Sequence, residues 1–465
     1  MTGSRRSGAI ARESARARFD LSAPRLLVGS FAALIAAGTA GFLVLPGLWI
    51  GERAGFVDAL FTATSAVCVT GLSVIDVSGR MTFRGQLWLL ALIQLGGIGI
   101  VTLAALAAAA LGRRMSLEVE EAAAGPTVVM PEGGPRALVR SVVRVTLVIE
   151  AIGAALLWLH WRNALGNRGA IWPAVFHAVS AFCNAGFSIF RDNLVGFTND
   201  PPTLAVIGLL IIAGGLGFLV FVDLQARVRG RRRRVTLHTR LVLITTAVLI
   251  AGAAPLYLFF EWNHTLAGHG LGARVANAAF MAVTPRTAGF NAIDYEQVSN
   301  PSLVLTLVLM WIGGSPGSTA GGVKTTTAAL LALLFVARLR GRKDVSFANR
   351  SVPDATAQRA VGLAVGAIVL LFAFVFALLF SEIPTGSVVT DRESFVHLVF
   401  EAQSALGTVG LSMNKTTDLS PPGRVLIVLL MFLGRVGPLA VLEAMARRSR
   451  RKQSYRLGRE DVLVG

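Results

Sequence analysis

The chain has 465 residues, of which 54% are hydrophobic and 15% are charged, and its formal net charge is +18. Soluble domains carry about 25% charged residues, so this composition excludes an ordinary soluble protein and, more firmly, a disordered one. Two cysteines exclude a disulfide framework and an array of zinc ribbons.

Eight stretches of the chain are long and apolar enough to cross a membrane as helices, which takes about 20 residues. In chain order they are Leu26 to Ile50, Leu87 to Leu111, Leu138 to Trp161, Leu204 to Val222, Leu241 to Phe260, Leu303 to Ala337, Val361 to Phe380 and Val425 to Ala444. A Gly-rich segment interrupts the sixth. No cleavable signal peptide is visible, because the Arg-rich N-terminus leads straight into a run of full spanning length.

Clusters of arginine flank these stretches at alternate ends, and the other loops carry balanced charge. The clusters are Arg5, Arg6, Arg12, Arg16 and Arg18; Arg113 and Arg114; Arg136, Arg140 and Arg144; Arg231 to Arg234 and Arg240; Arg338, Arg340, Arg342 and Lys343; and Arg447, Arg448, Arg450, Arg451 and Lys452. This positive-inside pattern predicts that both termini are cytoplasmic. We interpret the positive charge as a matter of topology and lipid headgroups, with no nucleic-acid partner.

Four of the remaining loops share a short, half-apolar segment that is too short to span a membrane. Its pattern is F-x-A-x-[ST], followed after a short gap by a glycine and then Leu or Phe. The copies are Phe61 to Ser65 with Gly71, Phe176 to Ser180 with Gly186, Phe280 to Thr284 with Gly289, and Phe400 to Ser404 with Gly410. The glycines recur roughly every 100 to 120 residues, which divides the chain into four units of span, short segment, glycine loop and span.

Glycines also recur inside the second span of each unit. They lie in the segments Gly96 to Gly99, Gly214 to Gly217, Gly313 to Gly317 and Gly434 to Gly437, the last with Arg435 in place of the second glycine. In the first two units we interpret them as sites of close helix packing.

The glycine loops could coordinate a cation if they lie close together around one axis. Non-helical backbone at membrane depth is tolerated only when it is buried in protein or lines a water-filled cavity. Four such loops around one axis satisfy that rule together, and their inward carbonyl oxygens can replace the hydration shell of a cation.

This fourfold unit, with Gly71, Gly186, Gly289 and Gly410, resembles the Trk/Ktr/HKT superfamily of cation transporters from about Leu26 to the end of the chain. Because the first span leads directly into the first loop, without the two extra N-terminal spans of Trk subunits, the resemblance is closest to the Ktr membrane subunit (KtrB). The resemblance implies an all-α polytopic membrane protein with four pseudo-repeats of span, pore helix, filter loop and span around a central pore, which makes eight full spans and four half-helices.

The resemblance also implies boundaries, partners and a location. The predicted segments are a basic N-terminus at 1–25, repeats at 26–115, 136–234, 238–343 and 358–448, and a C-terminal tail at 449–465. The implied function is potassium uptake across a bacterial cytoplasmic membrane by a homodimer with one pore per protomer, in contact with membrane lipids. A cytosolic, KtrA-like ring of nucleotide-binding subunits would regulate it in trans, since this chain has no nucleotide-binding domain.

Carried over to this sequence, the potassium filter consists of Val69, Thr70, Gly71, Asn184, Ala185, Gly186, Thr287, Ala288, Gly289, Thr408, Val409 and Gly410. Sodium-selective plant HKT proteins often have serine at the first filter glycine, so Gly71 favours potassium. The copies differ from Thr-Val-Gly, which predicts a simpler and less strict filter. A sodium or poorly selective cation transporter of the same fold remains the alternative, and some family members show sodium dependence.

The sixth stretch contains a segment, 313–327, that resembles the intramembrane gating loop of the family. Its Gly, Ser and Pro content cannot sustain a helix, and a lysine there is costly against lipid. The implied gating residues are Gly314, Gly317, Gly321, Gly322, Lys324 and Arg435. The segment is not a nucleotide-binding P-loop, because Val323 separates Gly322 from Lys324.

Arg435 invites the most specific hypothesis, because a charge at mid-membrane costs several kcal/mol or more and is usually functional. We expect it to face the cavity below the filter as an electrostatic barrier, in contact with the gating loop. The alternative is a structural anchor without effect on conduction.

Other residues near the loops invite plainer interpretations. Cys68 and Cys183 are expected to pack behind the filter rather than to bind metal. His177 and Glu401 are expected to have hydrogen-bonded structural roles. Asp76, Asp192 and Asp294 follow the loops and are candidates for concentrating cations at the outer mouth.

Two other classes of protein compete with transport. A membrane-embedded enzyme would need clustered acids or histidines, whereas Glu150 and Asp223 stand alone within the spans. A scaffold or sensor leaves the four glycine loops unexplained. We therefore predict a transporter and not an enzyme, with potassium as the transported ion, sodium as a second candidate, and no cofactor.

Overall fold

A computed structural model describes residues 23–110, 134–230, 234–342, 344–348, 350–382, 388–437 and 441. The predicted terminal segments at 1–25 and 449–465 therefore lie outside the described residues, apart from 23–25. The arginines and lysines at 113–114, at 231–233, at 343 and beyond 441, which are part of the positive-inside pattern, also lie outside the described residues.

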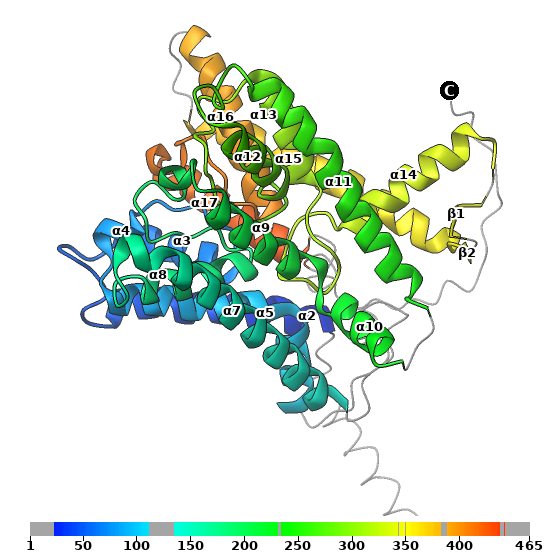
Figure 1. The fold of residues 1–465 in the computed structure, drawn as a ribbon, viewed down its shortest axis with the longest axis horizontal. Coiled ribbons are helices and arrows are strands. Elements are labelled where there is room, and N and C mark those ends of the chain that lie inside the picture. Colours follow the sequence, from blue (N-terminus) through cyan, green and yellow to red (C-terminus); the bar gives the residue numbers. More distant parts are fainter. Residues whose placement is uncertain are drawn as a thin grey trace, which may run out of the picture.

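The described chain is built almost entirely of helices, which recur in the same order in each quarter (Figure 1). The first quarter contains α2 (Ala23–Val44), α3 (Phe56–Val67), α4 (Val77–Arg80) and α5 (Phe83–Ala110). The second contains α7 (Gly134–Leu165), α8 (Ile171–Phe182), η2 (Val195–Phe197), α9 (Pro201–Leu216) and α10 (Phe218–Val228).

The second half of the chain follows the same plan. The third quarter contains α11 (Leu237–Glu261), α12 (Leu271–Val283), α13 (Asn300–Trp311) and α14 (Thr325–Leu339). A small antiparallel hairpin of β1 (Ser346–Phe347) and β2 (Arg350–Ser351) comes next. The fourth contains α15 (Asp354–Glu382), α16 (Val388–Gly407), η3 (Thr416–Asp418) and α17 (Pro421–Val436).

Four described helices are long and apolar enough to cross a membrane, and they are the first helix of each quarter: α2, α7, α11 and α15. The pair α9 and α10 adds a fifth span if it counts as one, although it bends by 92°. The sequence predicted one continuous span there. The difference arises at Gly217, whose φ of +87° ends α9 and re-aims the chain into α10.

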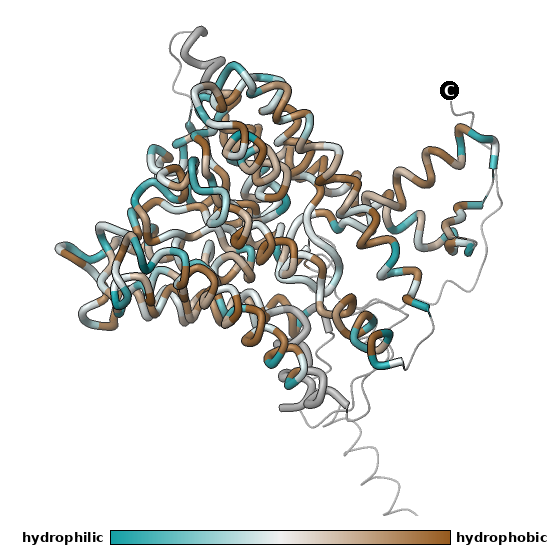
Figure 2. Tube along the Cα trace, in the orientation of Figure 1, coloured by the Kyte–Doolittle hydropathy of each residue, from teal (hydrophilic) through white to brown (hydrophobic). Residues whose placement is uncertain are grey.

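Large apolar side chains are exposed along the long helices. The exposed fractions of Phe259, Phe372, Phe376 and Phe380 are 77%, 68%, 75% and 88%. Figure 2 shows hydrophobic residues along most of the long helices and hydrophilic ones mainly in the loops. In water such a surface would drive aggregation, so these helices face lipid. The chain is a helical membrane protein.

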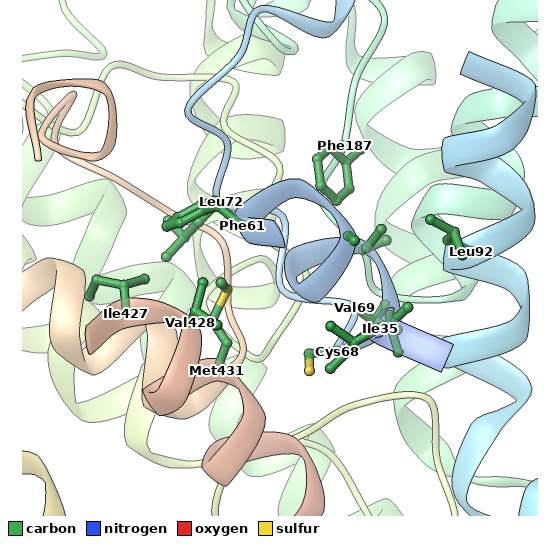
Figure 3. Packing of buried hydrophobic residues seen from close by; sticks show 14 of the residues in the cluster. Ile35, Phe61, Cys68, Val69, Leu72, Leu92, Phe187, Ile427, Val428 and Met431 are labelled. Carbon is green, nitrogen blue, oxygen red and sulfur yellow. The ribbon is translucent and has the colours of Figure 1, made fainter. Parts of the chain in front are cut away.

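The short helices α3, α8 and α12 and the end of α16 lie in the interior. The phenylalanine that opens each F-x-A-x-[ST] motif is almost fully buried; these are Phe61, Phe176, Phe280 and Phe400. The largest hydrophobic cluster joins the first quarter to the last. Figure 3 shows Phe61 and Leu72 on the side of α3 that faces Val428 of α17.

A second contact joins the first and last quarters at the first turns of α3 and α17. The Arg424 guanidinium donates to the Asp58 carboxylate at 2.6 Å across 366 residues of sequence. With α3 and α17 packed together, the four quarters form a closed ring rather than a row.

Glutamates at the ends of two long helices hold the starts of the next ones. Glu261 at the end of α11 accepts from the backbone N and the hydroxyl of Ser299, the N-cap of α13. Glu382 at the end of α15 binds Ser420, the N-cap of α17, in the same way. A carboxylate at a helix N-terminus satisfies free N–H groups and complements the helix dipole.

Candidate cation pathway

The inner helices, which are α3, α8, α12 and the end of α16, each lead into a loop with the same unusual backbone. The residue two positions before each loop glycine is not glycine and yet has a positive φ; the four are Val69 (55°), Asn184 (59°), Thr287 (71°) and Thr408 (49°). Positive φ is uncommon for such residues and persists only where the surroundings enforce it. Because the positive φ occurs at the same position relative to the glycine in all four loops, the loops share one backbone conformation. This includes the third loop, which is one residue shorter.

The four loop glycines meet in a closed ring. A Cβ placed on Gly71 would lie 2.5 Å from the carbonyl oxygen of Ala185, and one on Gly186 would lie 2.8 Å from that of Ala288. The same holds for Gly289 against Val409 and for Gly410 against Thr70, where the separations are also below 3.0 Å. Each glycine therefore abuts the carbonyl of the next loop, and only a residue without a side chain fits.

A hydroxyl group holds each of these loops in place, and it comes from the last residue of the F-x-A-x-[ST] motif. Ser65 and Ser404 accept from the backbone N of Gly71 and Gly410, both at 3.0 Å. In the other two copies the hydroxyl donates to a carbonyl just after the glycine: Ser180 to Phe187 at 2.8 Å and Thr284 to Phe290 at 2.5 Å. The sequence pattern contained these hydroxyls, but their role was missed.

All twelve residues predicted to form the filter lie in these loops, and the structure brings the four groups of three together around the glycine ring. Ten of the twelve are buried, and Gly71 and Gly410 are partly exposed. Each loop thus places a backbone carbonyl oxygen against the glycine of its neighbour, and four such carbonyls are gathered around the ring.

The glycines of the second spans serve close packing, as the sequence analysis expected for the first two units. A Cβ on Gly96 would lie less than 3.0 Å from the backbone of Val67, at the end of α3. Gly214 stands in the same relation to Phe182 at the end of α8, and Gly434 to Leu406 in α16.

Most of the segment predicted as a gating loop, residues 313–324, connects α13 to α14 without helical structure. Its last three residues, 325–327, are instead the first of α14, because three threonines and the apolar run after them continue as helix. A single parallel β-bridge between Ile312 and Val323 holds the two ends of this loop together. Two glycines in it, Gly317 and Gly322, have φ of +72° and +63°. A Cβ on Gly321 would collide with the Thr408 side chain, so this segment lies directly against the fourth glycine loop.

Arg435 contacts this loop, as predicted. It is 2% exposed, and its guanidinium donates to the carbonyl oxygen of Gly96 at 2.8 Å and to that of Thr319 in the gating loop. It also lies 5.9 Å from the ring centre of Phe31. Lys324 donates to the carbonyl of Ala320 at 2.8 Å, within the same loop.

Cys183 has polar neighbours that the sequence did not indicate. Its thiol donates to Gln94 at 3.5 Å and to Glu150 at 3.8 Å, and Gln94 donates to Glu150 at 3.1 Å. Glu150 is therefore not isolated but belongs to a network behind the second glycine loop. Cys68 is buried among apolar residues behind the first loop, as expected.

His177 and Glu401 form the hydrogen bonds expected of structural residues. They occupy the same position in their motifs, and each binds the serine two residues after the loop glycine. His177 lies 2.8 Å from Ser188, and Ser412 donates to Glu401 at 2.8 Å. Thr416 also donates to Glu401.

Two of the outer aspartates bind local backbone. Asp76 accepts from the backbone N of Ser78 and Gly79 as the N-cap of α4. Partial burial acts to raise the pKa of Asp76, but the hydrogen bond from the Ser78 hydroxyl, the two backbone bonds and the charge of Arg191 outweigh it and hold the pKa below its usual range. Asp294 accepts from the backbone N of Glu296 at 3.1 Å. Their attraction for cations at the mouth stays a prediction.

A cavity of about 210 Å³ lies beside the gating loop, between α5, α7 and the bend of α9 and α10. Its walls are mainly apolar, among them Val142 and Phe218, and one wall is the loop segment from Gly317 to Thr319.

Comparison with known proteins gives consistent matches. Residues 33–453 match the TrkH family, described as a cation transport protein. The chain is 37% identical over 453 residues to the potassium/sodium uptake protein NtpJ of Enterococcus hirae, which covers 97% of this chain and 99% of that protein. It is 36% identical over 447 residues to the Ktr system potassium uptake protein B of Bacillus subtilis, covering 95% and 96% of the two chains.

Among solved structures, the potassium transporter TrkH from Vibrio parahaemolyticus has a similar fold. The TM-score is 0.71 at 17% sequence identity, and the match covers 90% of this chain and 83% of that one.

Proposed function

Because the chain belongs to the TrkH family of cation transport proteins, we propose that it takes up potassium ions through the ring of four glycine loops. The family consists of cation transporters and not of enzymes. The observation that carries the proposal is the ring itself, in which each glycine abuts the carbonyl of the next loop after α3, α8, α12 and the buried end of α16.

In this proposal the twelve loop residues, from Val69-Thr70-Gly71 to Thr408-Val409-Gly410, form the selectivity filter. Potassium is supported by the names of the relatives in Enterococcus hirae and Bacillus subtilis. The first of these names also includes sodium, so a sodium or poorly selective cation pathway in the same fold is the second candidate.

The segment 313–327 is proposed as the gate. It lies against Thr408 of the filter on one side and is held by Arg435 on another. The Gly and Pro residues keep its backbone free of helix up to Lys324, and Lys324 and Arg435 add positive charge at the level where a cation would pass. Both features oppose cation movement until the loop shifts.

The remaining expectations are part of the same proposal. They are eight spans in four pseudo-repeats, both termini in the cytoplasm of a bacterium, a homodimer, and regulation by a cytosolic nucleotide-binding ring. The regulatory partner is supported by the name of the Bacillus subtilis relative, which assigns it to a Ktr system. Contact with lipid is supported by the apolar surface of the long helices.

The test is rubidium uptake and growth at limiting potassium in a bacterium that lacks its own potassium uptake. Wild type is compared with Gly71→Ser and Gly289→Ser, with and without sodium. We expect wild type to restore growth, and the serine variants to lose uptake or shift toward sodium, because a side chain intrudes on the next loop's carbonyl. Equal rescue by all three would refute the filter, and sodium uptake by wild type would favour the second candidate.

A further inference from the structure

Thr319 forms more hydrogen bonds to residues outside the gating loop than its neighbours in that loop do. It is 8% exposed, and all three of its polar groups are bonded outside the loop. Its hydroxyl donates to the carbonyl oxygen of Phe182 at 3.1 Å, and its backbone N donates to that of Gly214 at 3.3 Å. Its own carbonyl accepts from Arg435.

The partners of Thr319 belong to the filter's own support. Phe182 is the last residue of α8, and Asn184 of the second filter loop follows two positions later. Gly214 lies in the last turn of α9, packed against that same carbonyl of Phe182. The hydroxyl therefore occupies a free carbonyl at the C-terminal end of an inner helix, where the helix dipole favours a donor.

Two further backbone bonds fasten the loop to the same side. Ser315 donates from its backbone N to Gly215 at 2.9 Å, and Phe218 donates to the carbonyl of Gly317 at 3.1 Å. These bonds surround the bend at Gly217. Backbone groups cannot be exchanged for others by substitution, so the hydroxyl of Thr319 is the part of this attachment that depends on the side chain.

The cavity of about 210 Å³ borders the loop at Gly317, Ser318 and Thr319. The cavity is partly open to the surroundings of the protein, and a loop that must move needs such unfilled space beside it. On the far wall Val142 of α7 is 9% exposed, while Val148 of the same helix is 52% exposed and faces outward.

We propose that Thr319 latches the gating loop to the end of the second inner helix, and that the loop opens by moving into the cavity beside it. This inference rests on the proposed function of the loop as a gate. It makes Thr319 a positioning residue: it touches no ion but sets how often the loop is closed.

The first test compares Thr319→Val, which removes only the hydroxyl, with Thr319→Ser, which keeps it. One hydrogen bond shifts an equilibrium between two states by about two- to tenfold. We expect Thr319→Val to raise the maximal rate of rubidium uptake by about that factor, with an unchanged half-saturating concentration and unchanged preference over sodium. Thr319→Ser should return the rate to that of wild type. Rates are normalised to the amount of protein in the membrane.

The second test fills the cavity. Val142→Trp should lower the maximal rate by at least about twofold, because the loop then has no space to enter. Val148→Trp places the same side chain on the outward face of α7 and should leave the rate unchanged. An unchanged rate in Val142→Trp overturns the proposed movement, and this result remains decisive if Thr319→Val does not reach the membrane.

Arg435→Gln separates failure of the latch from failure of the gate. If Arg435→Gln raises uptake and Thr319→Val does not, the latch is wrong and the gate stands. If wild type conducts and neither variant changes the rate, the gate itself is wrong. If wild type does not conduct at all, the proposed function fails first.

Discussion

The hydroxyl that ends each F-x-A-x-[ST] motif does different work in different copies. In the first and fourth loops it accepts from a glycine N–H, and in the second and third it donates to a carbonyl. A hydroxyl can do both, which explains why Ser or Thr occupies the position while its neighbours vary.

This leads to a prediction for Ser404. Ser404→Ala removes the hydrogen bond to the N–H of the partly exposed Gly410, which costs about 0.5 to 1.5 kcal/mol. We expect weaker discrimination between rubidium and sodium in a competition assay, and a lower unfolding temperature in detergent. Ser404→Thr copies the third motif and should behave as wild type. An alanine variant with wild-type discrimination would show that the backbone alone holds the loop.

Arg435 carries a second prediction at this scale. Its guanidinium is bonded to Gly96 and to Thr319, so Arg435→Gln frees the loop on one side and removes positive charge from beside it. We expect faster rubidium uptake. Arg424→Gln is the matched control, since Arg424 pairs with Asp58 at a partly exposed position, where an ion pair is worth about 0 to 1 kcal/mol. Unchanged uptake in Arg435→Gln would favour the anchor role.

At the scale of residues, the sequence predicted some contacts of the candidate site and missed others. The four glycines and the contact of Arg435 with the gating loop were visible as patterns. The tie between Thr319 and Phe182 was not, because it joins a loop to the end of a helix far away in sequence. The network of Glu150, Gln94 and Cys183 was missed for the same reason.

At the scale of elements, the inner helices and their loops appeared where the motif predicted them. The bend of α9 and α10 did not, because Gly214 to Gly217 lies in an uninterrupted apolar run, and glycine there is equally typical of close packing. Both uses occur within four residues. Gly214 packs against α8, whereas Gly217 turns the chain.

The packing glycines lead to a stability prediction. A Cβ on Gly96 would overlap the backbone of Val67, so Gly96→Ala should cost about 1 to 3 kcal/mol. A Cβ on Gly252, in α11, would meet nothing within 4 Å, and alanine there should add up to about 1 kcal/mol of helix propensity. Thermal unfolding in detergent measures both. A Gly96→Ala protein as stable as wild type would mean that α3 and α5 can move apart freely.

At the scale of the whole molecule, the four quarters form two halves that meet at two places. The first and last quarters meet through α3 and α17, and the middle two through α9 and α12. We therefore expect a chain cut between α10 and α11 to restore rubidium uptake when both halves are made together, and neither half to do so alone. A cut after Gly289 breaks the glycine ring and should abolish uptake. Activity from one half would show that a complete ring is unnecessary.

The closed ring has a consequence for the order in which the protein is made. The contact between Gly71 and Gly410 forms only after the fourth loop has been synthesised. The ion pair of Asp58 likewise forms only after Arg424, 366 residues later, has been added. A ribosome adds about 5 to 20 residues per second, so the first loop spends many seconds in the membrane without its last neighbour. During that interval no ring surrounds an ion. Under the proposed function, a cell that is still synthesising this protein would therefore be spared a leak from unfinished chains, because the ring closes in a single late step.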